Sequence, residues 1–459
     1  MNEKSILSLW EKASKKAIED YLHFLSYPSV SSEKKHESDV KNCVDWLKNY
    51  MKTMGLKTEL IETAGHPTLL ASYEVDPNKP TLLLYGHYDV QPVDPIELWH
   101  SPPFSPTIID GSVFARGAQD NKGQIFYCIQ AVKYLLEEEG TLPLNIKFLI
   151  EGEEETGSLG LSKILPSIKD SIKADYVVVV DVGIPAKDEP AITLGLRGII
   201  TFDINLKGSK NDLHSGMYGG LAYNPNHALV KVLASLRDEN GKIAIPNFYD
   251  EVEDLTALER EEYDLEFDEK SYLSQTGFPP TGGEEIFSPG ERRATRPTLE
   301  INGINGGYSG DGFKTVIPKE AHAKISCRLV PNQDPEKIGL LVKNHIQKIV
   351  PKGIEVEVDF HEGKGMPVRL TKDSPLAKAF AESYESIFKK KCRYILEGAS
   401  IPIAAELKNA SGGDLLLVGL GLPEDLIHAP NENFSLDRFK KGFCIIAGAL
   451  FNLASVNKQ

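Results

Sequence analysis

Three short apolar runs, each ending at an acidic or histidine residue, constrain the fold of this chain most. They are TLLLYGH (81–87), NIKFLIEG (145–152) and YVVVVDV (176–182). Runs of this length and composition are typical of buried strands, and the apolar spacing over residues 122–139 is typical of a helix connecting the first two. The pattern predicts an α/β fold with a mostly parallel central sheet and flanking helices.

The pattern changes after Pro190, where strand-like and helix-like segments alternate in the order β, α, β, α, β. These segments are residues 192–208, 224–239, 315–331, 334–350 and 354–361. The order predicts a two-layer α+β domain at 191–369, inserted into a first domain made of 1–190 and 370–459. Residues 250–297 are rich in acids, glycines and prolines, which predicts an irregular excursion within the insertion.

Composition excludes several classes of protein. The 459 residues include 51 Lys and Arg against 66 Asp and Glu, and the resulting net charge of −15 disfavours nucleic-acid binding. Five scattered cysteines, none in a CxxC pair, indicate a reducing, cytoplasmic location and exclude a zinc site made of cysteines. The longest apolar run near the C-terminus, 443–451, is far shorter than the roughly 18 residues of a membrane span, so no membrane association is expected.

Acidic and histidine residues follow the predicted strands of the first domain. His87 and Asp89 follow the first, the acidic run 151–155 the second and Asp181 the third. Ligands bind at the carboxyl ends of strands in open α/β sheets, so these segments should converge. Asp120 in RGAQDNKG and His428 in IHAPNE complete a set of imidazoles and carboxylates suited to a pair of zinc or manganese ions.

Each residue also has an ordinary structural interpretation. Asp120 precedes a predicted helix and could be its N-terminal cap, a role compatible with metal binding. The acidic run could be a solvated loop, although clustered carboxylates at a strand end repel one another unless a cation is present. Asp181 could be a buried turn residue and His428 a surface histidine. Asp89, two residues after His87 on the same strand face, could orient the imidazole of His87.

The motifs resemble the two-metal peptidases and deacylases, a family that includes carnosine dipeptidase, aminoacylase, glutamate carboxypeptidase and succinyl-diaminopimelate desuccinylase. The central similarities are GHYDVQP, ARGAQDNKG and EGEEETGS, in that order. Further similarities, which favour the carnosine-dipeptidase branch, are DLHSG (212–216), KTVIP (314–318), RLVPNQ (328–333), EGASIP (397–402) and HAPNE (428–432).

The resemblance implies specific roles at the metal centre. It implies that each subunit binds two divalent ions, held by His87, Asp120, Glu155, Asp181 and His428. Asp120 would bridge both ions and be joined to Asn121 by a cis peptide bond. Glu154 would be the general base that takes a proton from the water activated by the metals.

The resemblance also implies roles in the inserted domain. His214 would reach the active site of a partner subunit in a homodimer and stabilise the oxyanion, although a lone glycine-flanked histidine is more often a loop residue. Thr315, Arg328 and Ser400 would hold the substrate, and the Arg328 guanidinium suits a free C-terminal carboxylate. Many dipeptidases of the family have a second glycine where this chain has Ala399, which bears on the shape of the substrate pocket.

The sequence therefore predicts a cytoplasmic, homodimeric, metal-dependent dipeptidase acting on small peptides with a free C-terminal carboxylate. Two alternatives stay open: an N-acyl or N-carbamoyl amino acid amidohydrolase of the same family, and a metal-binding relative without turnover. The ligand types suit zinc, manganese and cobalt equally.

Overall fold

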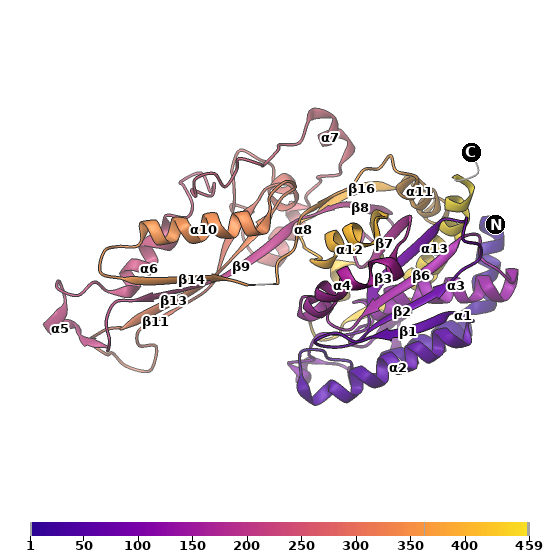
Figure 1. The fold of residues 1–459 in the computed structure, drawn as a ribbon, viewed down its shortest axis with the longest axis horizontal. Helices are drawn as coiled ribbons and strands as arrows, with labels where there is room; N and C mark the ends of the chain where they lie inside the picture. Colours follow the sequence, from indigo (N-terminus) through magenta and orange to yellow (C-terminus); the bar gives the residue numbers. More distant parts are fainter. Residues whose placement is uncertain (1, 362, 457–459) are drawn as a thin grey trace. The chain divides into compact units, whose positions relative to one another are not determined.

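The computed structural model describes residues 2–361 and 363–456. The chain forms two compact units. Unit 1 comprises Met1–Leu194, Leu370–Ile395 and Ile403–Gln459, and unit 2 comprises Gly195–Arg369 and Leu396–Pro402. Figure 1 shows the elements of both units.

The α-helices are α1 (Glu3–Leu25), α2 (Glu37–Thr53), α3 (Lys122–Glu139), α4 (Leu159–Ile172), α5 (Ser215–Tyr218), α6 (Pro225–Ala234), α7 (Ala257–Glu262), α8 (Glu269–Thr276), α9 (Pro289–Ala294), α10 (Pro335–Ile349), α11 (Pro375–Phe388), α12 (Ile403–Ser411) and α13 (Leu436–Val456). The strands are β1 (Lys57–Ile61), β2 (Thr68–Tyr73), β3 (Thr81–His87), β4 (Thr107–Ile109), β5 (Ser112–Phe114), β6 (Asn145–Glu151), β7 (Tyr176–Val180), β8 (Ala191–Leu196), β9 (Gly198–Lys207), β10 (Leu213–His214), β11 (Thr298–Gly306), β12 (Val316–Ile317), β13 (Glu320–Leu329), β14 (Glu355–Phe360), β15 (Val368–Arg369), β16 (Arg393–Glu397), β17 (Asp414–Val418) and β18 (Asn433–Ser435). The short 3-10 helices are η1 (Lys34–His36), η2 (Ile96–Leu98), η3 (Glu154–Thr156) and η4 (Pro423–Asp425).

Seven strands of the nine-stranded central sheet have the order β1-β2-β6-β3-β7-β17-β8. The pairs β6–β3, β3–β7 and β7–β17 are parallel, whereas β1–β2, β2–β6 and β17–β8 are antiparallel. The predicted α/β fold is therefore present, with its parallel part confined to the middle of the sheet. The edge formed by β1 and β2 is antiparallel rather than parallel, because a short loop joins these two strands. A short connection permits only antiparallel pairing.

Helices cover the strands of unit 1 as the sequence predicts. The contacts between helices and strands are α2 with β1 and β2, α3 with β3, α4 with β6, α11 with β17 and α12 with β7. The four central strands β3, β6, β7 and β17 are almost entirely buried. A strand buried on both faces reads as a continuous apolar run rather than an alternating one, which explains why these strands were recognisable in the sequence.

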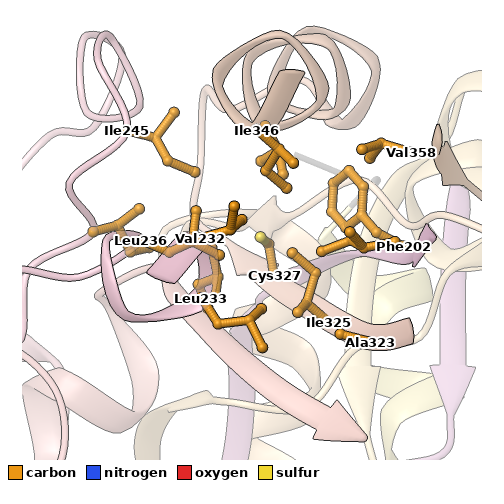
Figure 2. Close-up of a cluster of buried hydrophobic side chains, with 14 of the residues drawn as sticks. Phe202, Val232, Leu233, Leu236, Ile245, Ala323, Ile325, Cys327, Ile346 and Val358 are labelled. Carbon is orange, nitrogen blue, oxygen red and sulfur yellow. The ribbon is translucent and has the colours of Figure 1, made fainter. Parts of the chain in front are cut away.

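Unit 2 contains an antiparallel sheet of order β11-β13-β9-β14 with α6 and α10 packed against it. Buried side chains alternate along β9 and β13, as the period of a strand requires. The register places Ile200 opposite Cys327, Phe202 opposite Ile325 and Ile204 opposite Ala323. Figure 2 shows the resulting core, in which side chains from both helices meet those of the sheet.

Helix starts in this chain follow a repeated pattern. α6, α10 and α11 begin at the pairs Asn224–Pro225, Asp334–Pro335 and Ser374–Pro375, and in each pair the first side chain accepts a backbone N–H of the first turn. Proline suits the next position because its missing N–H would have had no helical partner. The predicted starts of α6 and α10, at residues 224 and 334, are therefore correct to within one residue.

Several predicted boundaries within residues 191–369 were wrong. The strand predicted at 192–208 is two strands, because β8 pairs in the sheet of unit 1 and β9 in that of unit 2. The strand predicted at 315–331 is interrupted at Pro318, which has no N–H for a ladder. The helix predicted at 224–239 ends at Ala234, and Asp238 then accepts the backbone N–H groups of a turn.

The segment 250–297 and the residues after it also differ from the prediction. The segment contains three short helices, two of which begin with capping boxes, Thr256–Glu259 and Ser288–Glu291. β11 was missed altogether. Its glycines and its bulge between Ile301 and Gly303 obscure the alternation, and most of its side chains are exposed. No helix in the described ranges is long and apolar enough to cross a bilayer.

Candidate metal centre

The ends of three parallel strands bring the predicted site residues together. β6, β3 and β7 are neighbours, and the last residue of β3, His87, lies opposite the last residue of β6. η3 follows β6 and carries Glu154 and Glu155, while Asp181 follows β7 directly. Parallel strands present their carboxyl ends at one edge of the sheet, so these residues converge as the sequence predicted.

Asp120 lies at the centre of the cluster. Its Oδ1 is 3.2 Å from Nε2 of His87, and its Oδ2 is 3.0 Å from Nε2 of His428. Asp181 Oδ2 lies 3.8 Å from the same nitrogen of His87. Glu155 Oε2 lies 3.3 Å from Nε2 of His428. Two donor groups result, each with its ligand atoms within 4.8 Å of one another, and Asp120 belongs to both.

The donor chemistry fits a pair of divalent metal ions. Each group offers one imidazole nitrogen and two carboxylates, a combination used for zinc and manganese. The shared carboxylate has one oxygen toward each histidine, so a single side chain can serve both groups. The three carboxylates would carry three negative charges against four positive charges on two divalent ions.

The electrostatics show how strongly these groups depend on one another. Hydrogen bonds to Asp120 and Glu155 raise the pKa of His428 from 6.5 to about 10. Burial would lower the pKa of His87, but its contacts with carboxylates raise it well above the usual value. Burial raises the pKa of Asp181. The neighbouring carboxylates thus favour the protonated form of both imidazoles, and burial favours the protonated form of Asp181.

Glu154 lies beside the donor groups without belonging to either. Its Oε2 is 4.0 Å from Nε2 of His87. Burial, with repulsion from neighbouring carboxylates, raises its pKa to about 8. A carboxyl group with a pKa near neutrality can both accept and release a proton in a reaction at that pH.

The acidic run 151–155 is divided between two environments. Glu151 is buried and accepts hydrogen bonds from Tyr85 and Ser158, and Glu153 accepts one of 2.9 Å from Thr63. Hydroxyl groups therefore bind Glu151 and Glu153, whereas Glu154 and Glu155 lie at the cluster around Asp120.

Asp89 contacts His87 in the way the sequence suggested, but for a different reason. β3 ends at His87, so Asp89 is not on the same face of the strand. Its Oδ1 instead lies 3.3 Å from Nδ1 of His87 because the chain turns after the strand. The carboxylate also accepts the backbone N–H groups of Glu154 and Glu155, at 3.3 and 3.2 Å. Asp89 therefore joins the ends of β3 and β6.

Two polar residues of the site were missed by sequence reasoning. Asn121 donates to Asp181 Oδ1 at 2.7 Å and accepts from the backbone N–H of His87 at 3.2 Å. Gln91 donates to Glu155 Oε2 at 2.8 Å. Both lie within the motifs quoted above, yet an amide carries no sequence signal that distinguishes a ligand-orienting role from a surface one.

The interpretation of Asp120 as a helix cap was wrong. The N-terminal cap of α3 is Asn121, and no side chain caps that end by a hydrogen bond. The Asp120–Asn121 peptide bond is cis, as the resemblance implied.

In unit 2, His214 and Thr315 lie close together. β10 pairs with β12, and the backbone N–H of Ser215 donates to the carbonyl of Thr315 at 3.1 Å. The His214 side chain is exposed, and its Nδ1 accepts the backbone N–H of Gly216 at 3.1 Å. This bond fixes the ring hydrogen on Nε2, which leaves Nε2 as a donor.

Arg328 and Ser400 form a second pair in unit 2. Nη1 of Arg328 donates to Oγ of Ser400 at 2.7 Å, and Ser400 donates to the carbonyl of Arg197. Arg197 also holds the segment around Ser400, since its backbone N–H bonds to the carbonyl of Ala399. The hydroxyl hydrogen of Ser400 is therefore already donated, so this side chain can only accept a further hydrogen bond.

Comparison with known proteins identifies the family. The model of peptidase family M20/M25/M40 matches residues 83–452. The chain is 31% identical over 455 residues to the Cys-Gly metallodipeptidase dug1 of Schizosaccharomyces pombe, covering 94% of each chain. It is 33% identical over 404 residues to the human Beta-Ala-His dipeptidase, covering 85% of this chain and 78% of the relative. The crystal structure of an M20 family metallo-carboxypeptidase from Sulfolobus solfataricus superposes with a TM-score of 0.86 at 35% identity, covering 96% of this chain and all of that one. The chain therefore belongs to peptidase family M20/M25/M40 and is a metallopeptidase.

Proposed function

We propose that this protein is a metal-dependent dipeptidase that hydrolyses dipeptides carrying a free C-terminal carboxylate. The observation that carries the proposal is the pair of donor groups sharing Asp120, with Glu154 beside them and in neither. The similarity to dipeptidases over most of the chain supports the same reaction.

Two divalent ions, zinc or manganese, would be held by the two donor groups. His87 and Asp181 would bind one ion, Glu155 and His428 the other, and Asp120 both. When bound, the ions would polarise the substrate carbonyl and lower the pKa of a water molecule toward neutrality.

Glu154 would act as the general base and then as the general acid. Its carboxylate takes a proton from the attacking water and passes it to the amine nitrogen that leaves when the peptide bond breaks. Asp89 would keep the His87 ring in place and fix the position of Glu154 through the backbone N–H it accepts. Glu154 alone would therefore transfer the proton, and the hydrogen bond from its backbone N–H to Asp89 would hold it in position.

Unit 2 would supply substrate recognition. Arg328 has an additional nitrogen, Nη2, and a fork geometry that suits a carboxylate. Its bond to Ser400 fixes the guanidinium, and the remaining acceptor capacity of Ser400 suits a substrate N–H. Thr315, exposed beside His214, would offer a hydroxyl to the substrate.

His214 would donate from Nε2 to the oxyanion that develops on the carbonyl oxygen when water attacks the carbonyl carbon, in the active site of a partner subunit. This role requires a homodimer, which we propose is formed through unit 2. The support is a set of exposed apolar side chains there: Met217 at 69%, Leu221 at 82%, Val230 at 61%, Ile304 at 60% and Phe313 at 91% exposed.

Light scattering tests the dimer. Ile304 lies on β11, which is an edge strand, so Ile304→Asp should shift the protein from dimer to monomer. Ile286→Asp is the matched control, because Ile286 is equally apolar and 84% exposed but lies in the excursion. A monomeric wild-type protein, or a dimer unaffected by Ile304→Asp, would exclude this interface.

The location proposed is the reducing interior of a cell. All five cysteines are buried and free. Free thiols in this number are typical of proteins that are not exposed to an oxidising compartment.

The decisive test combines metal analysis with a substrate panel. About two zinc or manganese ions per chain, and hydrolysis of Cys-Gly, β-Ala-His and other dipeptides that is lost on chelation and restored by add-back, would support the proposal. Hydrolysis only of acetyl, succinyl or carbamoyl amino acids would reassign the protein to the amidohydrolases of the family. Bound metal without any turnover would indicate a non-catalytic relative.

A further inference from the structure

Glu432 occupies an unusual position next to the metal centre. Its side chain is fully buried, and both carboxylate oxygens are used twice. Oε2 accepts from Nη1 of Arg116 at 2.8 Å and from the backbone N–H of Gly117 at 2.9 Å. Oε1 accepts from the backbone N–H groups of Gln119 and Asp120, at 2.9 and 3.0 Å.

The Glu432 carboxylate accepts more hydrogen bonds than an ion pair with Arg116 requires. A carboxylate that only neutralised Arg116 would need one or two bonds to the guanidinium. Here three of the four donors are backbone N–H groups of the turn that carries Asp120, so the carboxylate fixes the path of that turn. Arg116 is itself fully buried, donates to the carbonyl of Pro92 at 2.8 Å and lies over the ring of Trp99. Arg116, which donates to the Glu432 carboxylate, is therefore itself fixed by other contacts.

The same residue also connects two segments that carry metal-binding candidates. Glu432 follows His428 by four residues, and its carbonyl accepts the backbone N–H of Ala115 at 3.1 Å. The turn before α3 and the loop before β18 are thus joined through both the backbone and the side chain of one residue. Asp120 and His428 are the groups that these two segments bring to 3.0 Å.

We infer that Glu432 is a positioning residue of the metal centre, which sets the orientation of the Asp120 carboxylate toward both donor groups. This inference rests on the proposed metal site and deepens it. The Glu432 carboxylate bonds to the backbone N–H of Asp120 and not to its carboxylate oxygens, so it would act through the position of Asp120. Removing such a support typically lowers metal affinity 10- to 100-fold.

The first variant is Glu432→Gln. The amide keeps the size of the side chain, but its NH₂ group cannot accept the N–H groups that one carboxylate oxygen now accepts. Zinc titration against a fluorescent chelator, without substrate, should show affinity reduced 10- to 100-fold at one or both sites. With metal in excess, kcat should fall while KM stays within about threefold, because the substrate-binding residues proposed in unit 2 are unchanged.

A matched control separates positioning from loss of a buried ion pair. Asp425 is also fully buried and accepts from the guanidinium of Arg438 through both oxygens, but it makes no bond to the turn of Asp120. Asp425→Asn should lower the melting temperature of the metal-free protein as Glu432→Gln does. Its zinc affinity should stay within about threefold of wild type.

The double variant Glu432→Gln/Arg116→Met decides the matter if the single variant folds poorly, because it removes both buried charges together. If Glu432 only neutralises Arg116, the double variant will bind zinc like the wild type, and the inference is overturned. Equal zinc affinities for Glu432→Gln and the wild type would overturn it as well. A wild-type protein that binds two metal ions but cleaves no dipeptide would remove the proposed activity and leave this test intact.

Discussion

The two units differ in how far their functional side chains are exposed to solvent. In unit 1, His87 and Asp89 are completely buried and the Asp89 carboxylate accepts the backbone N–H groups of Glu154 and Glu155, although the His428 side chain is 53% exposed. In unit 2, His214 and Thr315 are exposed, and large apolar side chains lie at the surface. The difference indicates a division of labour: charges kept away from water and fixed in advance suit bond cleavage, whereas accessible donors suit recognition.

The largest effect that would test this division is expected at Glu154. Glu154→Gln should reduce kcat by about 10²–10⁴-fold, since general base catalysis contributes that much, with metal content unchanged by elemental analysis. Glu153→Gln is the control, because Glu153 is the adjacent carboxylate but bonds to Thr63. Its rate should stay within about threefold of wild type. Full activity of the Glu154 variant would assign the base elsewhere.

A smaller effect, on binding rather than on chemistry, is expected at Arg328. Arg328→Lys keeps the charge but not the two-pronged geometry, so KM for dipeptides should rise about 10- to 100-fold with metal content unchanged. The rise should vanish for dipeptide amides, which lack the carboxylate. An equal loss for acids and amides would show that Arg328 does not recognise that group.

Metal binding should release protons, and this effect belongs to unit 1 alone. The pKa of His428 is about 10 in the metal-free protein, so its imidazole is protonated at pH 7.5 and must lose that proton before its nitrogen can bind a metal ion. Affinity should therefore increase with pH up to about 10. Calorimetry at pH 7.5 in buffers of different ionisation enthalpy should give at least about one proton released per chain. His428→Asn should release fewer, and identical heats in all buffers would contradict the prediction.

The smallest effect is expected in the core of unit 2. Ile346 is fully buried there, and Ile346→Val should lower the free energy of unfolding by about 1 kcal/mol. Zinc affinity should not change, because the metal centre draws its residues from unit 1. Denaturant unfolding and zinc titration of the same preparation measure both. A change in zinc affinity would mean that the units are energetically coupled.

The sequence predicted what depends on local pattern. His87 and Asp181 could be located because buried parallel strands read as apolar runs and their ends share one edge of the sheet. Asn121 and Gln91 could not, because their bonds depend on how distant segments pack. β11 was hidden for a local reason, since Gly303 and a bulge break its alternation. Within 250–297, composition concealed three helices, of which two are indicated only by their capping boxes.

The strand order also affects how this protein is made. β17 lies between β7 and β8 in the sheet although it is synthesised long after both. Roughly 250 residues separate Asp181 from His428, which is about 12–50 s of translation at about 5–20 residues per second. During that time the emerging chain holds one donor group, while the other lacks its histidine and the edge of β7 has no partner. A ribosome that stalls between β8 and β17 would therefore hold a chain that contains all three residues of one donor group but lacks both His428 and Glu432, the residue inferred to position Asp120.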